Sequence, residues 1–164
     1  MSSMFLEFDE INNILRNDSD LWKLIYYRST HYYDNPLDKD DILLLPPDQK
    51  NEIINMRLKP SPVTQDLVKE AICRIIFHPA TRRPQSQSYA VATQFVDFDI
   101  FVHHSFNDAD MRLTKICDQI NGIFNHKHFR GLGKFKFEGG NPFTFEGEYV
   151  GYTLTYSFGS VNSK

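Results

Sequence analysis

The stretch with the most chemical potential is FVDFDIFVHH, residues 95–104, where two aspartates stand close to a pair of histidines. Carboxylate and imidazole groups together can hold zinc or iron. The same stretch alternates apolar with other residues, as a β-strand with one buried face does. On such a strand, Asp97, Asp99 and His103 share one face, so the stretch is either a site or only a strand.

A metal site near this stretch is the less favoured interpretation. His103 and His104 are neighbours, and neighbouring side chains on a strand point to opposite faces, so we do not expect them to bind one metal. Asp108 and Asp110 fall at the N-terminus of a predicted helix, and His126 and His128 follow its C-terminus. The helix dipole favours negative charge at the first position and positive charge at the second, which explains these residues without a metal. We therefore expect no metal, no cofactor and no catalytic residue. The side chains considered were Asp97, Asp99, His103, His104, Asp108, Asp110, His126 and His128.

Other catalytic signatures are missing from the sequence. GLGKFKF, residues 131–137, lacks the spacing of a phosphate-binding loop and precedes a predicted strand instead of a helix. No GxSxG motif occurs. Cys73 and Cys117 each lie in an apolar periodic segment without a CxxC pair, which indicates buried, reduced thiols. We expect a protein that is not an enzyme.

Length and charge limit the remaining classes. The chain has 164 residues, 41% of them hydrophobic, and a net charge of −3. Arg82 and Arg83 are the only adjacent basic pair, so the basic surface of a nucleic-acid-binding protein is not expected. The acidic N-terminus does not resemble a signal peptide, and no apolar run is long enough for a membrane span, which indicates a cytosolic, soluble protein.

The first third of the chain predicts helices. Apolar residues recur at helical spacing on both sides of the polar stretch NDSD, where Asp18 or Ser19 would cap the second helix. A third, short helix is predicted over residues 48–56, after two prolines. We expect residues 1–58 to form a helical segment that packs on residues 59–164 within one compact domain. The apolar positions are Phe8, Ile11, Ile14 and Leu15, followed by Leu21, Trp22, Leu24 and Ile25.

The remainder predicts strands and one amphipathic helix. An apolar run ends at Pro79, and polar residues 80–89 predict a mobile hairpin or long loop before strand 95–104. Residues 108–124 predict a single helix, with its start near Asn107. Two strands follow, the last with apolar residues at every second position from Val150 to Phe158. The fold class is therefore α+β: N-terminal helices and a mostly antiparallel sheet of about four strands, covered on one side by an amphipathic helix.

The order of these segments resembles a family of phage proteins. VDFDIFVHHSF, DADMRLTKICDQINGIF, LGKFKF and EYVGYTLTYSF, together with the opening DLWKLIYYRSTHYYDNPLDKDDIL, are similar to the tail terminator or tail completion proteins of tailed bacteriophages. The resemblance implies a small α+β subunit that assembles into a homo-oligomeric ring, usually a hexamer, at the tail-neck junction. It further implies contacts with the tail tube protein and the head-tail connector, location in the virion after assembly in the host cytoplasm, and passage of DNA through the ring without sequence-specific binding.

Under this interpretation, the polar segment and the acids of the strand become contact residues. Arg82 and Arg83 would bind carboxylates of a neighbour, and the two aspartates would be solvated or paired across a subunit boundary. Two other classes stay open as alternatives: a small metal-dependent enzyme with an Asp/His site and a small nucleic-acid-binding module. The predicted interface residues are Arg82, Arg83, Gln85, Gln87, Asp97 and Asp99.

Overall fold

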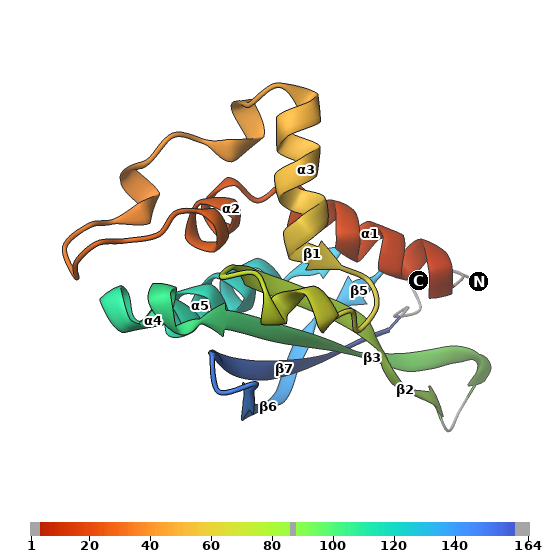
Figure 1. Cartoon of the computed structure of the whole chain (residues 1–164). Helices are drawn as coiled ribbons and strands as arrows, with labels where there is room; N and C mark the ends of the chain where they lie inside the picture. Colours follow the sequence, from red (N-terminus) through yellow and green to blue (C-terminus); the bar gives the residue numbers. More distant parts are fainter. Residues whose placement is uncertain (1–3, 86–87, 160–164) are drawn as a thin grey trace.

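The computed structural model describes residues 4–85 and 88–159, and it begins with three helices (Figure 1). They are α1 (Met4–Arg16), α2 (Ser19–Tyr26) and α3 (Pro47–Arg57), with short 3-10 turns η1 (Pro36–Asp38) and η2 (Ile42–Leu44) before α3. The predicted break at NDSD is confirmed, because the Asp18 side chain accepts a hydrogen bond from the Leu21 N–H at 2.8 Å and caps α2. Among the described residues, no helix combines the length and the apolar character that spanning a bilayer demands.

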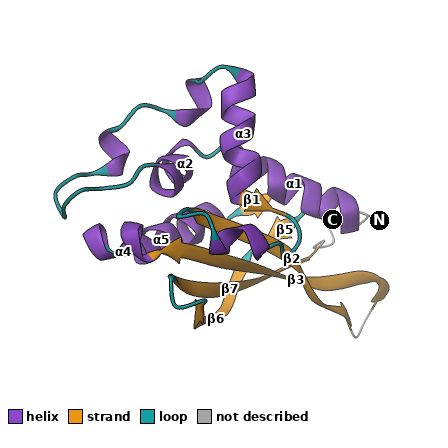
Figure 2. Cartoon of the chain, in the orientation of Figure 1, coloured by secondary structure: helices purple, strands orange, loops and turns teal. Residues whose placement is uncertain are grey.

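The centre of the molecule is a five-stranded sheet in the order β1-β2-β3-β7-β6 (Figure 2). All pairs are antiparallel except the short parallel pair of β1 with β2. The α+β class is thus confirmed, and the strand beyond the expected four is the two-residue β1. The strands are β1 (Leu58–Lys59), β2 (Cys73–Gln85), β3 (Ser88–His103), β6 (Lys136–Phe145) and β7 (Tyr149–Gly159); β4 (His128–Phe129) and β5 (Gly133–Lys134) form a small separate sheet.

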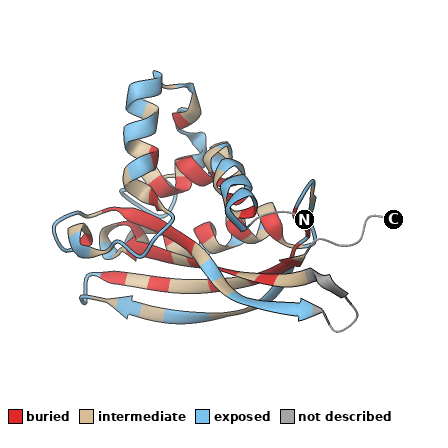
Figure 3. Cartoon of the chain, turned by 90° about the vertical axis from the view of Figure 1, so that its right-hand side faces the viewer, coloured by how far each residue is buried: buried red, intermediate tan, exposed pale blue. Residues whose placement is uncertain are grey.

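One face of the sheet packs against the helices and forms the main core. The predicted alternation is confirmed on β3, because Val96, Phe98, Ile100 and Val102 all belong to this core. On β7, Leu154, Tyr156 and Phe158 belong to it, and Val150 and Tyr152 pack against it. The ring of Phe98 on β3 stacks on Phe124 of the last helix with 5.0 Å between centroids, and Phe8 of α1 meets Phe158 of β7 edge-on at 6.1 Å. Buried residues run along the strands and the facing sides of the helices (Figure 3). Residues 1–58 and 59–164 therefore contribute to the same core.

The predicted helix over residues 108–124 is wrong in its boundaries. The structure has α4 (His104–Asp110) and α5 (Arg112–Phe124), separated by Met111 in the left-handed conformation with φ of 56°. Asp108 and Asp110 therefore lie near the C-terminal end of a helix, and the dipole argument for them does not hold. Asn107 does bind the start of a helix, but that helix is α5 and begins later than predicted. The Asn107 side chain accepts a hydrogen bond from the Leu113 N–H in the first turn of α5 at 3.0 Å.

The polar segment 80–89 forms a hairpin instead of a long loop. Strand β2 continues to Gln85 and β3 begins at Ser88, with a register shift between Pro79 and Arg82. Strand β7 pairs with β3 only from Thr93 to His103, so the distal part of the hairpin extends beyond the described end of β7 (Figure 1). We call residues 80–92, without the undescribed pair 86–87, the hairpin arm.

Candidate functional site

Within residues 4–85 and 88–159, the face of the sheet opposite the helices is covered at one end. There, the 3-10 turn η3 (Gln65–Val68) and Ile72 pack on Ile76, Phe101 and Tyr149 in a second, smaller core. Under this cover the Arg74 guanidinium is fully buried and makes two hydrogen bonds, of 2.6 and 2.7 Å, to the Asp66 carboxylate. Beyond this small core the sheet face carries polar side chains, which we call the open face.

Hydrogen bonds between neighbouring strands organise the open face. Asp99 accepts a hydrogen bond from the Thr153 hydroxyl at 2.7 Å and lies 2.9 Å from Nε2 of His78. Asp97 accepts a hydrogen bond from the Thr155 hydroxyl at 2.6 Å. The two aspartates share one face of β3, as predicted from the alternation, and each is held by a partner within the same subunit.

The open face and the histidine pair are separate features. Asp99 and His103 lie four residues apart on one strand, so their backbones are about 13 Å apart at about 3.3 Å per residue. His126 and His128 are exposed beyond the end of α5. The single Asp/His site considered from the sequence is therefore not assembled in the described part of the chain.

A different cluster forms at the junction of β3 and α4, and we call it the His-Glu corner. His103, His104 and Glu148 each offer one ligand atom, and these atoms all lie within 4.8 Å of one another. The expectation that the two histidines point to opposite faces is wrong, because the strand ends at His103 and a helix begins at His104. Their ring centroids are 4.3 Å apart.

The backbone brings Glu148 to the two histidines. Strand β6 turns into β7 through Glu146 and Gly147, which have φ values of 54° and 67°, as a tight hairpin turn requires. Glu148 follows this turn, and its carbonyl accepts a hydrogen bond from the His104 N–H at 3.0 Å. Glu148 was not predicted as a site residue, although the EGE turn before an alternating strand is a hairpin signal.

The polar atoms of the corner are already paired with one another. Oε2 of Glu148 lies 3.0 Å from Nε2 of His104 and 3.5 Å from Nε2 of His103. The Ser105 N–H donates to Nδ1 of His103 at 3.2 Å, which favours the tautomer with its proton on Nε2. Burial, reinforced by His104, lowers the pKa of His103 below its ordinary value, while Glu148 opposes this shift. The His103 ring is therefore neutral at neutral pH.

The two adjacent arginines of the hairpin arm have different surroundings. Arg82 faces the helices and donates to the buried Glu7 carboxylate of α1 at 3.1 Å and to the buried Gln94 amide oxygen at 3.0 Å. Arg83 is exposed, and its guanidinium lies 5.5 Å from the Phe95 ring centre. The predicted interface residue Gln87 lies outside the described residues, and for Gln85 the structure describes only the backbone.

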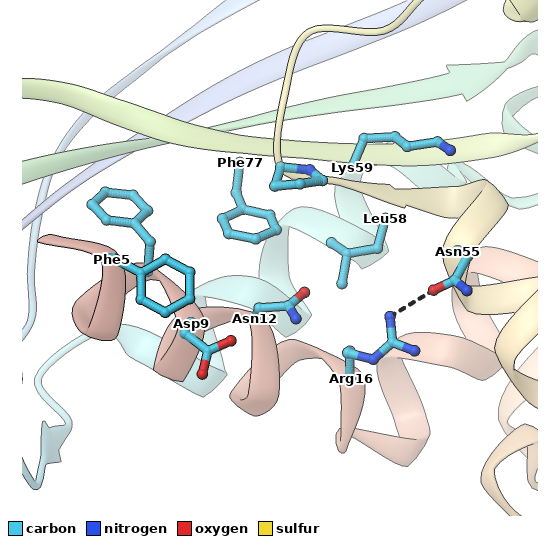
Figure 4. Close-up of a pocket in the computed structure, with 10 residues that line it drawn as sticks. Phe5, Asp9, Asn12, Arg16, Asn55, Leu58, Lys59 and Phe77 are labelled. Atoms are coloured by element: carbon cyan, nitrogen blue, oxygen red, sulfur yellow. Dashed lines mark hydrogen bonds between the residues drawn. The ribbon is translucent and has the colours of Figure 1, made fainter.

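A groove of about 450 Å³ lies between α1, α3, β1 and β2 (Figure 4). Phe77 and Leu58 form an apolar wall of the groove. At one end of the groove, Arg16 donates a hydrogen bond to the Asn55 side chain at 3.0 Å. Phe5 on the first turn of α1 is 75% exposed at the other end. The titratable side chains that line the groove are Asp9, Arg16 and Lys59.

The two cysteines match the expectation of unreactive thiols. Both are free, with Cys73 buried and Cys117 half-buried. Burial raises the pKa of each thiol to about 12, so neither forms the reactive thiolate at neutral pH.

The sequence is similar to known proteins over most of its length. The family described as YomW matches residues 18–158. Over 180 aligned residues, the chain is 24% identical to the SPbeta prophage-derived uncharacterized protein YomW of Bacillus subtilis (strain 168). That alignment covers 98% of this chain and 99% of the relative. Because the family match spans far more than half of the sequence, this protein belongs to the YomW family.

Proposed function

We propose that this protein is a structural component of a tailed bacteriophage that assembles into a ring at the tail-neck junction and has no catalytic role. The prophage origin of its relative, over nearly the full length of both chains, supports a phage protein. The observation that carries the assembly role is the hairpin arm, which extends beyond the described end of β7 and exposes Arg83.

A projecting arm suits a head-to-tail contact between identical subunits. Such a heterologous contact closes into a ring when the rotation between subunits divides a full turn. The arm of one subunit would lie on the open face of the next, with Arg83 near the carboxylates of Asp97 and Asp99. Planar guanidinium groups bind carboxylates through two parallel hydrogen bonds, which fixes the orientation of the two partners.

Direct pairing of sheet edges is a less suitable contact. The outer edge of β6 contains Gly140 and Pro142, and the distal part of β2 contains Pro79 and Pro84. Proline lacks the N–H that a further strand needs, and such residues on edge strands prevent pairing between sheets. A contact through side chains of the arm fits these edges better.

The contact is tested by replacing one arginine at a time in tag-free protein and measuring the mass distribution by mass photometry. Arg83→Ala should shift the population from rings to single subunits without lowering the melting temperature. Arg130→Ala, on an exposed arginine between β4 and β5, is the matched control and should leave the rings intact. Rings that persist in Arg83→Ala, or that are lost equally in Arg130→Ala, would contradict the proposed contact.

A further inference from the structure

We propose that the His-Glu corner binds one divalent transition-metal ion through His103, His104 and Glu148. Nothing in the assembly role requires this site, and it stands on its own geometry. Two imidazoles and one carboxylate form a common set of zinc ligands, which leaves one position for water or for a group from another molecule.

The distances already approach those of a bound ion. Ligand atoms that each lie about 2.0–2.1 Å from a tetrahedral zinc are roughly 3.3 Å from one another. Oε2 of Glu148 lies 3.0 Å from one Nε2 atom and 3.5 Å from the other. All three ligand atoms lie within 4.8 Å of one another, so side-chain rotations can bring them to the spacing that one ion needs.

Each ring has an oxygen near its second nitrogen, Nδ1, which leaves Nε2 for the metal ion. Nδ1 of His104 lies 3.8 Å from the Asp108 carboxylate one turn along α4, and Nδ1 of His103 lies 2.8 Å from the Ser105 hydroxyl. Ligating histidines ordinarily donate their second ring N–H to such a carboxylate or hydroxyl. Metal binding through Nε2 would move the His103 proton to Nδ1, which would then lose the hydrogen bond from the Ser105 N–H and donate to the Ser105 hydroxyl oxygen instead.

The backbone restricts the corner before any ion arrives. His103 pairs with Tyr149 in the sheet, its ring meets the Tyr149 ring at 5.1 Å, and the His104 N–H is bonded to the Glu148 carbonyl. The nearby cation Arg28, which would repel a metal ion, is held by the Ala71 carbonyl at 2.9 Å and lies over the Phe106 ring. A metal ion would join the end of β3, the start of α4 and the β6–β7 turn.

The ligand chemistry selects the class of ion. Imidazole nitrogens suit zinc, copper and nickel, whereas magnesium and calcium prefer sites made entirely of oxygen. We therefore expect Zn²⁺ to bind and Mg²⁺ or Ca²⁺ in large excess not to displace it.

Isothermal titration calorimetry with Zn²⁺ tests the site, with EDTA-treated and dialysed protein that carries no polyhistidine tag. Wild-type protein should bind one ion per chain. His104→Asn and Glu148→Gln should abolish this saturable binding, and Asp108→Asn should weaken it about 10-fold, as loss of an orienting carboxylate does. The X-ray absorption spectrum of the zinc complex should show two imidazole ligands.

Two controls separate the site from general histidine binding and from misfolding. His126→Asn combined with His128→Asn removes two exposed histidines outside the corner and should leave zinc binding unchanged. Each variant should melt cooperatively in the absence of metal, so that a loss of binding is not a loss of folding. No uptake of zinc by the wild type, equal uptake by folded His104→Asn protein, or loss of uptake in the His126 and His128 control would each overturn the proposal.

Discussion

The guanidinium of Arg112 and the carboxylate of Asp110 form an ion pair with both side chains fully buried and 3.0 Å between Nη2 and Oδ2. Arg112 also donates to the Leu24 carbonyl at 2.7 Å, to the Tyr27 carbonyl and to the Ser29 hydroxyl at 2.8 Å. The Arg112 side chain therefore connects the junction of α4 and α5 to the C-terminal end of α2 through hydrogen bonds. The left-handed Met111 lies between the two charged residues and turns both of them inward.

Replacing Arg112 should destabilise the protein strongly. Arg112→Met leaves the Asp110 carboxylate buried without its main partner, which should lower the free energy of unfolding by about 3–5 kcal/mol. Urea denaturation followed by circular dichroism measures this change. The double replacement Arg112→Met with Asp110→Leu should cost less than Arg112→Met alone, because it removes the unpaired charge. A double variant less stable than the single one would contradict this explanation.

Arg82 and Arg83 should differ in their effect on stability. Arg82→Ala breaks the ion pair with the buried Glu7 carboxylate. It should lower the free energy of unfolding by about 1–2 kcal/mol, a cost between that of breaking an exposed ion pair and that of breaking a buried one. Arg83→Ala removes an exposed side chain whose guanidinium lies over the Phe95 ring, and it should change the stability by less than about 0.5 kcal/mol. Thermal melts of the two variants side by side make the comparison, and equal melting temperatures would contradict it.

Asp66 should contribute stability that depends on pH. Its hydrogen bonds from Arg74 lower the pKa of its carboxyl group below the ordinary value of about 4, so the folded state binds fewer protons than the unfolded state. This contribution is complete above pH 5 or so and is lost as the pH falls through the lowered pKa. Asp66→Asn should therefore cost about 1–2 kcal/mol at neutral pH, since its carboxylate is 42% exposed.

The control for this prediction is the pH series itself. The difference in unfolding free energy between wild type and Asp66→Asn should begin to shrink as the pH falls below about 5, where the unfolded wild-type chain starts to bind a proton at Asp66, and should be lost as the pH falls through the lowered pKa of the folded state. Denaturation curves of both proteins across this range measure the difference. A difference that stays constant would show that the charge of Asp66 does not act on the buried Arg74.

Local patterns were sufficient to predict the fold class. The alternation from Val150 to Phe158 places each apolar side chain in the main core or against it, and Asp18 caps α2 as its position before LWKLI indicates. These features depend on neighbours along the chain, where side-chain periodicity and capping act. The break at Met111 was not predicted, because a non-glycine residue with positive φ is stabilised by the distant contacts of Arg112 and not by its own sequence.

The functional candidates depend on long-range contacts, which no local pattern encodes. Glu148 reaches His104 from 44 positions along the chain, and Arg82 reaches Glu7 from 75 positions. The histidine pair was visible in the sequence, but its geometry depends on the change from strand to helix between its two members. The open face was predicted correctly on β3, whereas the threonines that hold its aspartates lie on β7 and become partners only through the strand order.

The most direct test of the assembly role is the oligomeric state of the wild-type chain, measured by native mass spectrometry over a concentration series and by negative-stain imaging of the same samples. We expect closed rings of one discrete size with rotational symmetry, whose fraction rises with concentration at the expense of single subunits. Single subunits at every concentration, or open chains of many sizes without a closed form, would contradict the proposed ring.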